Sequence, residues 1–326
     1  MPSDRKPFNL DLVVTRACPM ACGYCRMDRR GGAMPKGVWK RGVELLLREE
    51  GPLELQFLGG EPLVEYDLLR DISAFAASRA LKAGKPLSRL VTTNGLLLTP
   101  ARSRELAEEG CGVMLSIDGG REVQAAQRPM AGAGSWAVLR RNMAGLLGSG
   151  ARFFVNLVVT PESAGRLAGG AAFLIKEGVR SLQIAYALGV IWSEESLRTL
   201  ERQLRVVSLL AEDARPKVDL YNRRNEAEPV LLSPQHLVDS DGTLFVGVAI
   251  VLEELWPGLQ RAFRVGDVRR IERFPGRRMT QADQLRRLRS AKLDPAGRGI
   301  MLNNLAAGYR IRKFWEGERG RQSLPR

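Results

Sequence analysis

Apolar, β-rich segments recur along much of the chain and alternate with stretches whose apolar residues have helical spacing. Six of these segments are expected to be strands: 10–15, 53–58, 87–92, 112–117, 153–159 and 181–187. The expected helices are 38–49, 66–82, 100–109, 136–147 and 163–176, and the last strand–helix unit ends near residue 211. Continuous apolar strands that alternate with amphipathic helices are typical of parallel βαβ units.

These six units predict an α/β fold, a partial (βα)6 TIM-like barrel, because they are too few to close a full barrel. The functional residues of such a fold lie at the carboxyl edge of the sheet, in the loops directly after strands. From about Asp213 the pattern changes to a polar stretch, a hairpin over 238–250 and basic helical material. We therefore expect three parts: a barrel over 1–212, a smaller C-terminal α+β region over 213–315 and a basic mobile tail over 316–326.

Composition indicates a globular protein, since 44% of the 326 residues are hydrophobic and 26% are charged. The longest apolar runs, 153–160 and 244–252, are far shorter than the roughly 20 residues that cross a bilayer. No signal sequence is evident at the N-terminus, so we expect a cytoplasmic protein without membrane contact. The net charge of +14 is densest after Arg261. It fits either a solvated arginine-rich surface or attraction to an acidic peptide or to nucleic acid.

Three of the four cysteines, Cys18, Cys22 and Cys25, fall within eight residues directly after the first expected strand. This grouping in a long chain indicates a metal site rather than a disulfide scaffold. Iron–sulfur clusters normally take four cysteines, so three would leave one iron of a cubane open for another ligand. Zinc is the main alternative, but a closed zinc site needs four ligands, and neither His236 nor Cys111 is placed to complete one. Buried, inert cysteines are the second alternative.

The spacing C-x-x-x-C-x-aromatic-C, with Tyr24 as the aromatic residue, resembles the signature of the radical S-adenosylmethionine (SAM) superfamily. The resemblance implies one 4Fe–4S cluster on the three cysteines, with SAM bound to the open iron through its amino and carboxylate groups. It also implies an external electron donor such as flavodoxin or ferredoxin, and cleavage of SAM to a 5'-deoxyadenosyl radical. The protein would then supply orientation and exclusion of water.

Two further motifs after strands resemble the same superfamily. Gly59, Gly60 and Glu61 match its GGEP motif, in which glycines let the backbone approach a ligand and the carboxylate can accept from the SAM ammonium group. Thr93 and Asn94 begin a segment that resembles its T-N-G turn. Each string alone is also compatible with an ordinary turn.

The segment from Ser116 to Gly119 resembles the S-x-D-G motif of the peptide-modifying branch, with Asp118 as its acid. Arg128 stands at the position where that branch has a downstream arginine. The resemblance implies that Ser116 and Arg128 contact the ribose or carboxylate of SAM, and arginine suits a carboxylate because its planar fork donates two parallel hydrogen bonds. The adenine and ribose pocket would include Asn156 and Val158 on the fifth strand. A surface position for Arg128 and simple packing of the strand residues are the alternatives.

The C-terminal region resembles SPASM and twitch domains through its hairpin at 238–245 and the segment 266–268. Those domains hold auxiliary iron–sulfur clusters on cysteines, but no cysteine follows Cys111 here, so no auxiliary cluster is expected. A plain structural hairpin is the alternative. Cys111 is expected to be buried, and His236 to lie in a surface loop.

Together these motifs predict a radical SAM enzyme that modifies a peptide or protein side chain in ribosomal peptide maturation. This function follows from the family resemblance, and the catalytic residues and the reaction stay unassigned. Radical modification of RNA and a non-catalytic metal-binding scaffold are the two alternatives.

Overall fold

The computed structural model describes residues 6–129, 134–224, 229–247, 249–275 and 280–322. Its strands form one sheet in the order β10-β9-β8-β1-β2-β3-β4-β5-β6-β7. The first six strands are β1 (Phe8–Thr15), β2 (Leu53–Gly59), β3 (Leu87–Thr93), β4 (Gly112–Ser116), β5 (Phe153–Val159) and β6 (Ser181–Tyr186). The remaining four are β7 (Asp219–Leu220), β8 (His236–Val238), β9 (Thr243–Val246) and β10 (Arg264–Asp267).

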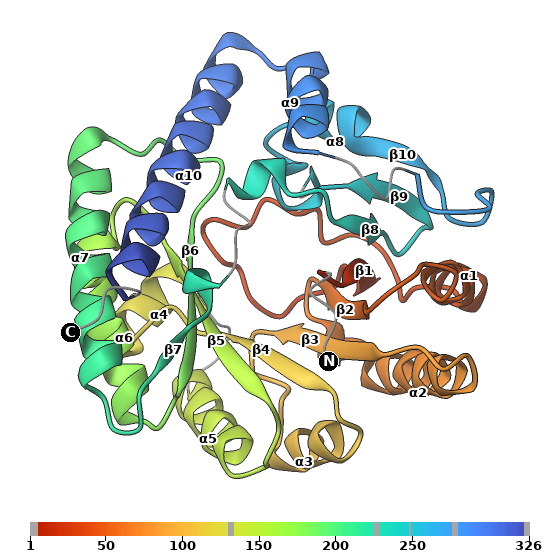
Figure 1. The fold of residues 1–326 in the computed structure, drawn as a ribbon, viewed down its shortest axis with the longest axis horizontal. Helices are drawn as coiled ribbons and strands as arrows, with labels where there is room; N and C mark the ends of the chain where they lie inside the picture. Colours follow the sequence, from red (N-terminus) through yellow and green to blue (C-terminus); the bar gives the residue numbers. More distant parts are fainter. Residues whose placement is uncertain (1–5, 130–133, 225–228, 248, 276–279, 323–326) are drawn as a thin grey trace.

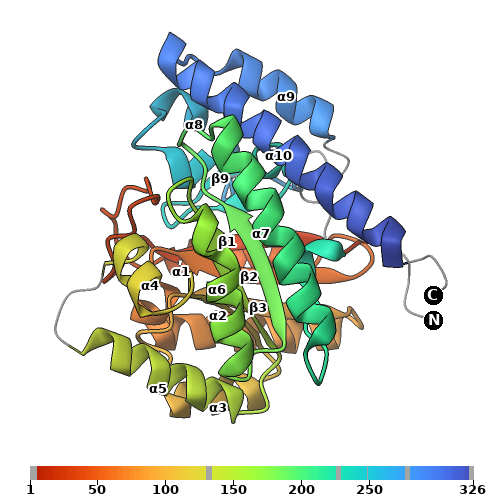
Figure 2. The same cartoon turned by 90° about the vertical axis from the view of Figure 1, so that its left-hand side faces the viewer.

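Each strand from β1 to β6 pairs in parallel with the next strand in the chain. The connecting helices cover the outer side of the curved sheet (Figure 1). They are α1 (Lys36–Leu46), α2 (Tyr66–Lys82), α3 (Pro100–Glu108), α5 (Ser135–Leu147), α6 (Leu167–Lys176) and α7 (Glu194–Asp213). The short helix α4 (Arg121–Gln127) lies instead at the carboxyl edge, where its end contacts the loop after β1 (Figure 2). Because β7 and β10 end the sheet, it curves without closing, and the predicted partial (βα)6 barrel is confirmed.

Local sequence explains where these helices begin. The side chain of Thr99 accepts a hydrogen bond from the Arg102 backbone amide at 3.3 Å, and Pro100 occupies the first helical position of α3. The expected helix 100–109 is thus confirmed to within a residue. Helix α4 was not predicted, because its seven residues are too short to give a clear apolar period.

Alternation along β1 divides the apolar interior into two clusters. Leu10, Leu12 and Val14 pack in the main core with the barrel helices. Val13 points to the opposite face and packs in a second cluster that contains Leu237 of β8 and other residues of the C-terminal region. The inner face of β1 is therefore covered by the C-terminal half of the chain.

The C-terminal strands extend the barrel sheet rather than forming a sheet of their own. Strand β8 pairs in parallel with β1 and antiparallel with β9. A hairpin was expected over 238–250, and the observed one begins two residues earlier and ends at Val246. Helices α8 (Pro257–Phe263) and α9 (Gln281–Ser290) follow before the long α10 (Pro295–Gln322). The division of the chain at residue 212 stays a prediction.

Two expectations for this half of the chain are wrong. The mobile tail was expected from residue 316, but α10 continues to Gln322 because Phe314 and Trp315 pack in the main core, and α10 lies beside α7 (Figure 2). Residues 323–326 lie outside the described residues. His236 is only 4% exposed: its ring stacks on Phe8, and Nε2 lies 2.9 Å from the Pro275 carbonyl oxygen. Cys111 is buried as expected.

Among the described residues, no helix has both the length and the apolar character that a membrane span requires.

Candidate active site

The three clustered cysteines lie on the loop that leaves the carboxyl end of β1, and all three are partly buried. The side-chain amide of Asn94 lies 3.8 Å from the Cys18 sulfur, within hydrogen-bonding reach of a thiolate. Burial raises the pKa of Cys22 to about 11 and also raises the pKa of Cys18. Both thiols therefore hold their protons at neutral pH until a metal displaces them.

The loop is attached to the segment that follows β4. The amide of Ala21 donates to the Pro129 carbonyl oxygen at 3.2 Å, and the amide of Gly23 donates to the Gln127 carbonyl oxygen at 3.0 Å. Within the described part of the chain, no three histidine, cysteine or acidic side chains are grouped so that they could hold one metal ion.

Gly59 and Gly60 are required by the close approach of the β2 end to the cysteine loop. Gly59 has a φ of +143°, and a Cβ there would lie 2.1 Å from the Thr15 carbonyl oxygen. A Cβ on Gly60 would lie 2.4 Å from the carbonyl oxygens of both Arg16 and Ala17. The glycines thus bring two backbone segments together, where the sequence indicated only an approach to a ligand.

Glu61 is fully buried and accepts three hydrogen bonds from the protein. Its donors are the Asn94 amide at 2.7 Å, the Thr93 hydroxyl at 2.8 Å and the Leu63 amide at 3.1 Å. Burial raises the pKa of Glu61 to about 7 despite these donors. The carboxylate therefore fastens the end of β2 to the turn after β3, and its predicted contact with the SAM ammonium group stays a prediction.

Asp118 connects the cysteine loop to the barrel. Its Oδ2 accepts from the Tyr24 hydroxyl at 2.9 Å and from the Gln127 side chain at 2.8 Å. Its Oδ1 accepts from the Val158 amide at 2.9 Å. The guanidinium of Arg128 contacts Asp118 Oδ2 at 2.9 Å and lies over the Tyr24 ring at 5.4 Å from its centroid. Asp118 thereby holds together the loop, the end of α4 and the fifth strand.

Ser116 and Asn156 are register partners on β4 and β5, and Val158 follows two residues later on the same face of β5. Arg128 is 6% exposed, which excludes the surface position. The buried side-chain oxygen of Asn156, Oδ1, has no hydrogen-bond partner among the described residues. Buried polar atoms are rarely left unpaired, so this atom fits the binding of a polar ligand.

The donor set fits the cofactors that the motifs imply. Three thiols on one loop, an amide beside one of them, an unpaired acceptor on β5 and a buried guanidinium suit a 4Fe–4S cluster with SAM at its open iron. The predicted residues Tyr24, Asn94, Asp118 and Arg128 all touch the cysteine loop or one another.

Sequence reasoning missed the role of Gln127, which also donates to the Val158 carbonyl oxygen at 2.8 Å. The available signal was that this polar residue directly precedes the predicted Arg128. It also missed the ion pairs of Arg16, which lies just before the cysteine motif.

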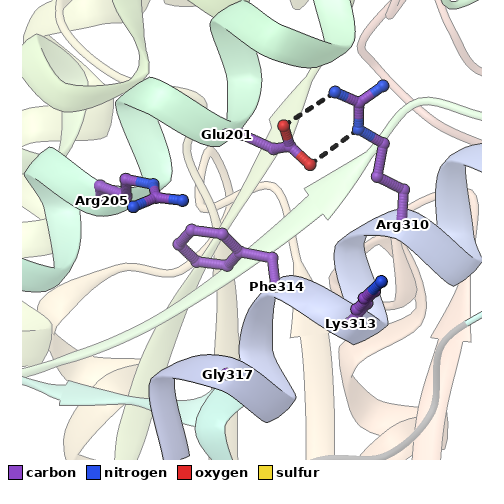
Figure 3. A pocket seen from close by; sticks show the side chains of 6 residues that line it. All are labelled: Glu201, Arg205, Arg310, Lys313, Phe314 and Gly317. Carbon is purple, nitrogen blue, oxygen red and sulfur yellow. Dashed lines mark hydrogen bonds and ion pairs between the residues drawn. The ribbon is translucent and has the colours of Figure 1, made fainter. Parts of the chain in front are cut away.

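Two surface pockets in the described part of the chain bear on where the site lies. One, of about 570 Å³, is lined by Cys22 and Cys25 together with three arginines and two acids: Arg26, Arg29, Arg30, Asp28 and Glu254. The other, of about 410 Å³, lies between α7 and α10, where Arg310 pairs with Glu201 beside Phe314 (Figure 3). It contains none of the predicted site residues, so we place the candidate active site at the cysteine loop.

Loop cysteines at the carboxyl edge of a partial (βα)6 barrel define an iron–sulfur domain of the radical SAM type. Residues 12–167 match the family model of the radical SAM superfamily, and the chain therefore carries a radical SAM domain.

Several curated relatives match part of the chain, and more than one of them is named PqqA peptide cyclase. A PqqA peptide cyclase of Bradyrhizobium diazoefficiens is 34% identical over 121 residues, which are 36% of this chain and 30% of the relative. A GTP 3',8-cyclase of a Synechococcus species is 37% identical over 121 residues, which are 35% of this chain and 34% of the relative. The chain thus spans about a third of the length of these relatives.

A solved structure, native anSMEcpe with bound AdoMet and Cp18Cys peptide, has the same fold. Its TM-score is 0.72 at 18% sequence identity, and the match covers 96% of this chain and 98% of the other. The likeness extends through the C-terminal region as well as the barrel.

Proposed function

We propose that the chain is a radical SAM enzyme that modifies a peptide or protein side chain during the maturation of a ribosomally made peptide. The observation that carries the proposal is the loop of Cys18, Cys22 and Cys25, held at the barrel edge beside the Asp118–Arg128 pair. A peptide substrate is supported by the relatives named PqqA peptide cyclase and by the Cp18Cys peptide bound to the solved structure of the same fold.

One 4Fe–4S cluster with SAM supplies, when bound, the reductive cleavage that yields a 5'-deoxyadenosyl radical. The three cysteines would hold the cluster, and Asn94 would donate to the Cys18 sulfur. Tyr24 keeps its proton because burial raises its pKa, so its hydroxyl donates to Asp118 and keeps the loop against the barrel. This fixed loop is what lets a cluster form at one defined place.

The remaining predicted residues would bind SAM. Arg128 carries a buried positive charge, which suits the carboxylate of SAM, and Asn156 offers an unpaired acceptor oxygen. The wider set proposed for the SAM site is Gly59, Gly60, Glu61, Thr93, Ser116 and Val158. Their position around the strand ends would exclude water from the reacting atoms.

An acidic one-electron donor such as flavodoxin or ferredoxin would reduce the site from the pocket beside Cys22 and Cys25. The side chains of Arg26, Arg29 and Arg30 line that pocket with Asp28 and Glu254, so the three arginines outnumber the two acids, although Arg30 pairs with Asp28. This excess of positive charge would suit an acidic donor. A reducing compartment is required for this chemistry, so we place the protein in the cytoplasm.

Anaerobic reconstitution with iron and sulfide tests the proposal. The wild type is expected to bind about four irons per chain and to release 5'-deoxyadenosine from SAM when dithionite is added. Cys22→Ala should lose both properties, whereas Cys111→Ala, a change at the buried cysteine just before β4, should keep both.

Three results would contradict parts of the proposal. Zinc in place of iron would exclude the cluster. A cluster without SAM cleavage would support the non-catalytic scaffold. Salt-sensitive RNA binding together with failure to modify any short peptide encoded beside the gene would favour RNA as substrate.

A further inference from the structure

The two ends of the cysteine loop are joined at its base. Arg16 lies two residues before Cys18, and Asp28 lies three residues after Cys25. Nη1 of Arg16 donates to the Asp28 carbonyl oxygen at 2.9 Å. The side chain of Arg16 therefore joins the two ends of the loop that carries all three cysteines.

A single carboxylate of the C-terminal region bridges the same two ends. Glu253 Oε1 accepts from the Asp28 amide at 2.5 Å and also from Arg16 Nη1, while its Oε2 lies 3.2 Å from Arg16 Nη2. The side chain of Gln260 donates to Glu253 as well. Glu253 thus contacts the residues before and after the cysteine motif at once.

Asp239 supplies a second carboxylate to the same guanidinium. Its Oδ1 accepts from Arg16 Nε at 3.0 Å, and its Oδ2 accepts from Arg16 Nη2. The backbone amide of Ser240 donates to Asp239 Oδ1 at 2.6 Å. Arg16 is therefore bound from both sides of its planar fork, a geometry that a lysine could not reproduce. We call Arg16, Asp239 and Glu253 together the clasp.

Burial makes the ion pairs of the clasp consequential. The side chains of Arg16, Asp239 and Glu253 are 12%, 4% and 9% exposed. Exposed ion pairs contribute little to stability, but removing one partner of a buried pair leaves an uncompensated charge. Each carboxylate has protein donors beyond Arg16, so the group is satisfied as built.

The segment after Cys25 also packs against the C-terminal region. The backbone amide of Arg26 donates to the Val251 carbonyl oxygen at 3.3 Å, and the Arg26 carbonyl oxygen accepts from the Glu254 amide at 3.0 Å. Met27 is 4% exposed and packs in the second apolar cluster with residues of the C-terminal region. The C-terminal region thus holds the exit of the loop through backbone, apolar and ionic contacts.

We propose that Asp239 and Glu253, acting through Arg16, are positioning residues that close the cysteine loop and set the places of the three thiols for cluster binding. This inference rests on the proposed function. It gives the C-terminal region, which has no cysteine, a direct part in the site: its carboxylates hold the loop that carries the only clustered thiols in the sequence.

Hydrogen–deuterium exchange on the metal-free full chain tests the closing of the loop. Glu253→Ala is expected to speed exchange of the Cys25 and Asp28 amides about tenfold, the equivalent of one charge-assisted hydrogen bond. Glu253→Gln should have a smaller effect, because its side-chain oxygen can still accept from Asp28. Asp241→Ala is the matched control, since Asp241 lies in the same turn as Asp239 and contacts Thr243 rather than Arg16.

Iron release to a chelator from the reconstituted proteins tests the positioning of the thiols. Glu253→Ala is expected to release iron about tenfold faster than the wild type and Asp241→Ala. The proposal would be overturned if the loop amides of Glu253→Ala exchanged at the wild-type rate, or if its loop and core amides exchanged faster together. It would also be overturned if the loop amides of this variant exchanged faster but its iron release were unchanged. Failure of the proposed function would give a different result, because the wild type itself would take up no iron. The hydrogen–deuterium exchange of the metal-free proteins would still show whether the clasp closes the loop.

Discussion

Replacing Asp118 by asparagine removes the negative charge at the centre of the site with almost no change of shape. The side chain of Asp118 is fully buried, and it faces Arg128, whose side chain is 7% exposed. Removing one partner of a buried ion pair costs about 3–5 kcal/mol, because the other charge is left uncompensated. We expect Asp118→Asn to lose this much stability and to lower Tm by roughly 10 °C. Since a domain of this kind is stable by about 5–15 kcal/mol, the variant should remain folded at room temperature.

Urea unfolding followed by circular dichroism measures the loss, and two further variants identify its cause. Tyr24→Phe removes one of the hydrogen bonds to Asp118 and should cost about 1 kcal/mol. Adding Arg128→Met to Asp118→Asn removes the stranded charge and should recover part of the stability. Glu122→Gln in α4, the helix between Asp118 and Arg128, is the control and should change little, because the Glu122 side chain is 90% exposed. A loss below about 1 kcal/mol for Asp118→Asn, or a further loss on adding Arg128→Met, would refute the reasoning.

Three more perturbations follow from the same structure. Gly60→Ala places a Cβ 2.4 Å from two backbone carbonyl oxygens of the cysteine loop and should abolish iron binding. Gly23→Ala is the control, because its Cβ meets no atom within 4 Å, and it should still bind iron. The iron content of the two variants after reconstitution tests this prediction. Burial raises the pKa of Asp11 to about 8. A carboxyl whose pKa rises on folding from 3.8 to about 8 contributes stability below about pH 4 and loses this contribution as the pH rises to about 8. Urea midpoints should therefore show the stability of Asp11→Asn increasing relative to that of the wild type between about pH 4 and pH 8, by at most about 1.4 kcal/mol per pH unit. Arg26→Glu with Arg30→Glu should slow SAM cleavage driven by flavodoxin about tenfold at low salt, relative to cleavage driven by dithionite; equal slowing with both reductants would count against docking at this pocket.

Much of the barrel could be predicted because its signals are local. The period of apolar residues located all six strands from β1 to β6, and the Thr99 cap with Pro100 located the start of α3. The motifs that follow these strands could be predicted to lie close together, because the carboxyl ends of parallel strands meet at one edge of the sheet. Glu61 after β2 and Thr93 at the end of β3 are far apart in the sequence, yet they are joined by a 2.8 Å hydrogen bond.

The errors concern residues whose environment depends on distant parts of the chain. His236 was expected at the surface because it lies close to Pro234 in an expected loop, but Phe8 and Phe274, each far away in the sequence, cover its ring. Residues 316–322 resemble a charged tail, since arginine and glutamate dominate there, and their helix is held by apolar side chains earlier in α10. Local composition does not report such long-range packing.

The clasp at Arg16 could not be found from the sequence for the same physical reason. Arg16 is separated by more than 200 residues from both of its carboxylate partners, and nothing in the intervening sequence marks Asp239 or Glu253 as different from surface acids. Only the sheet makes the contact necessary: β8 pairs with β1, so the turn that follows β8 must lie beside the loop that follows β1. An acid in that turn and an arginine in that loop then meet at the carboxyl edge, where the cysteines begin. The strand pairing that completes the fold therefore also brings the C-terminal region to the cluster loop.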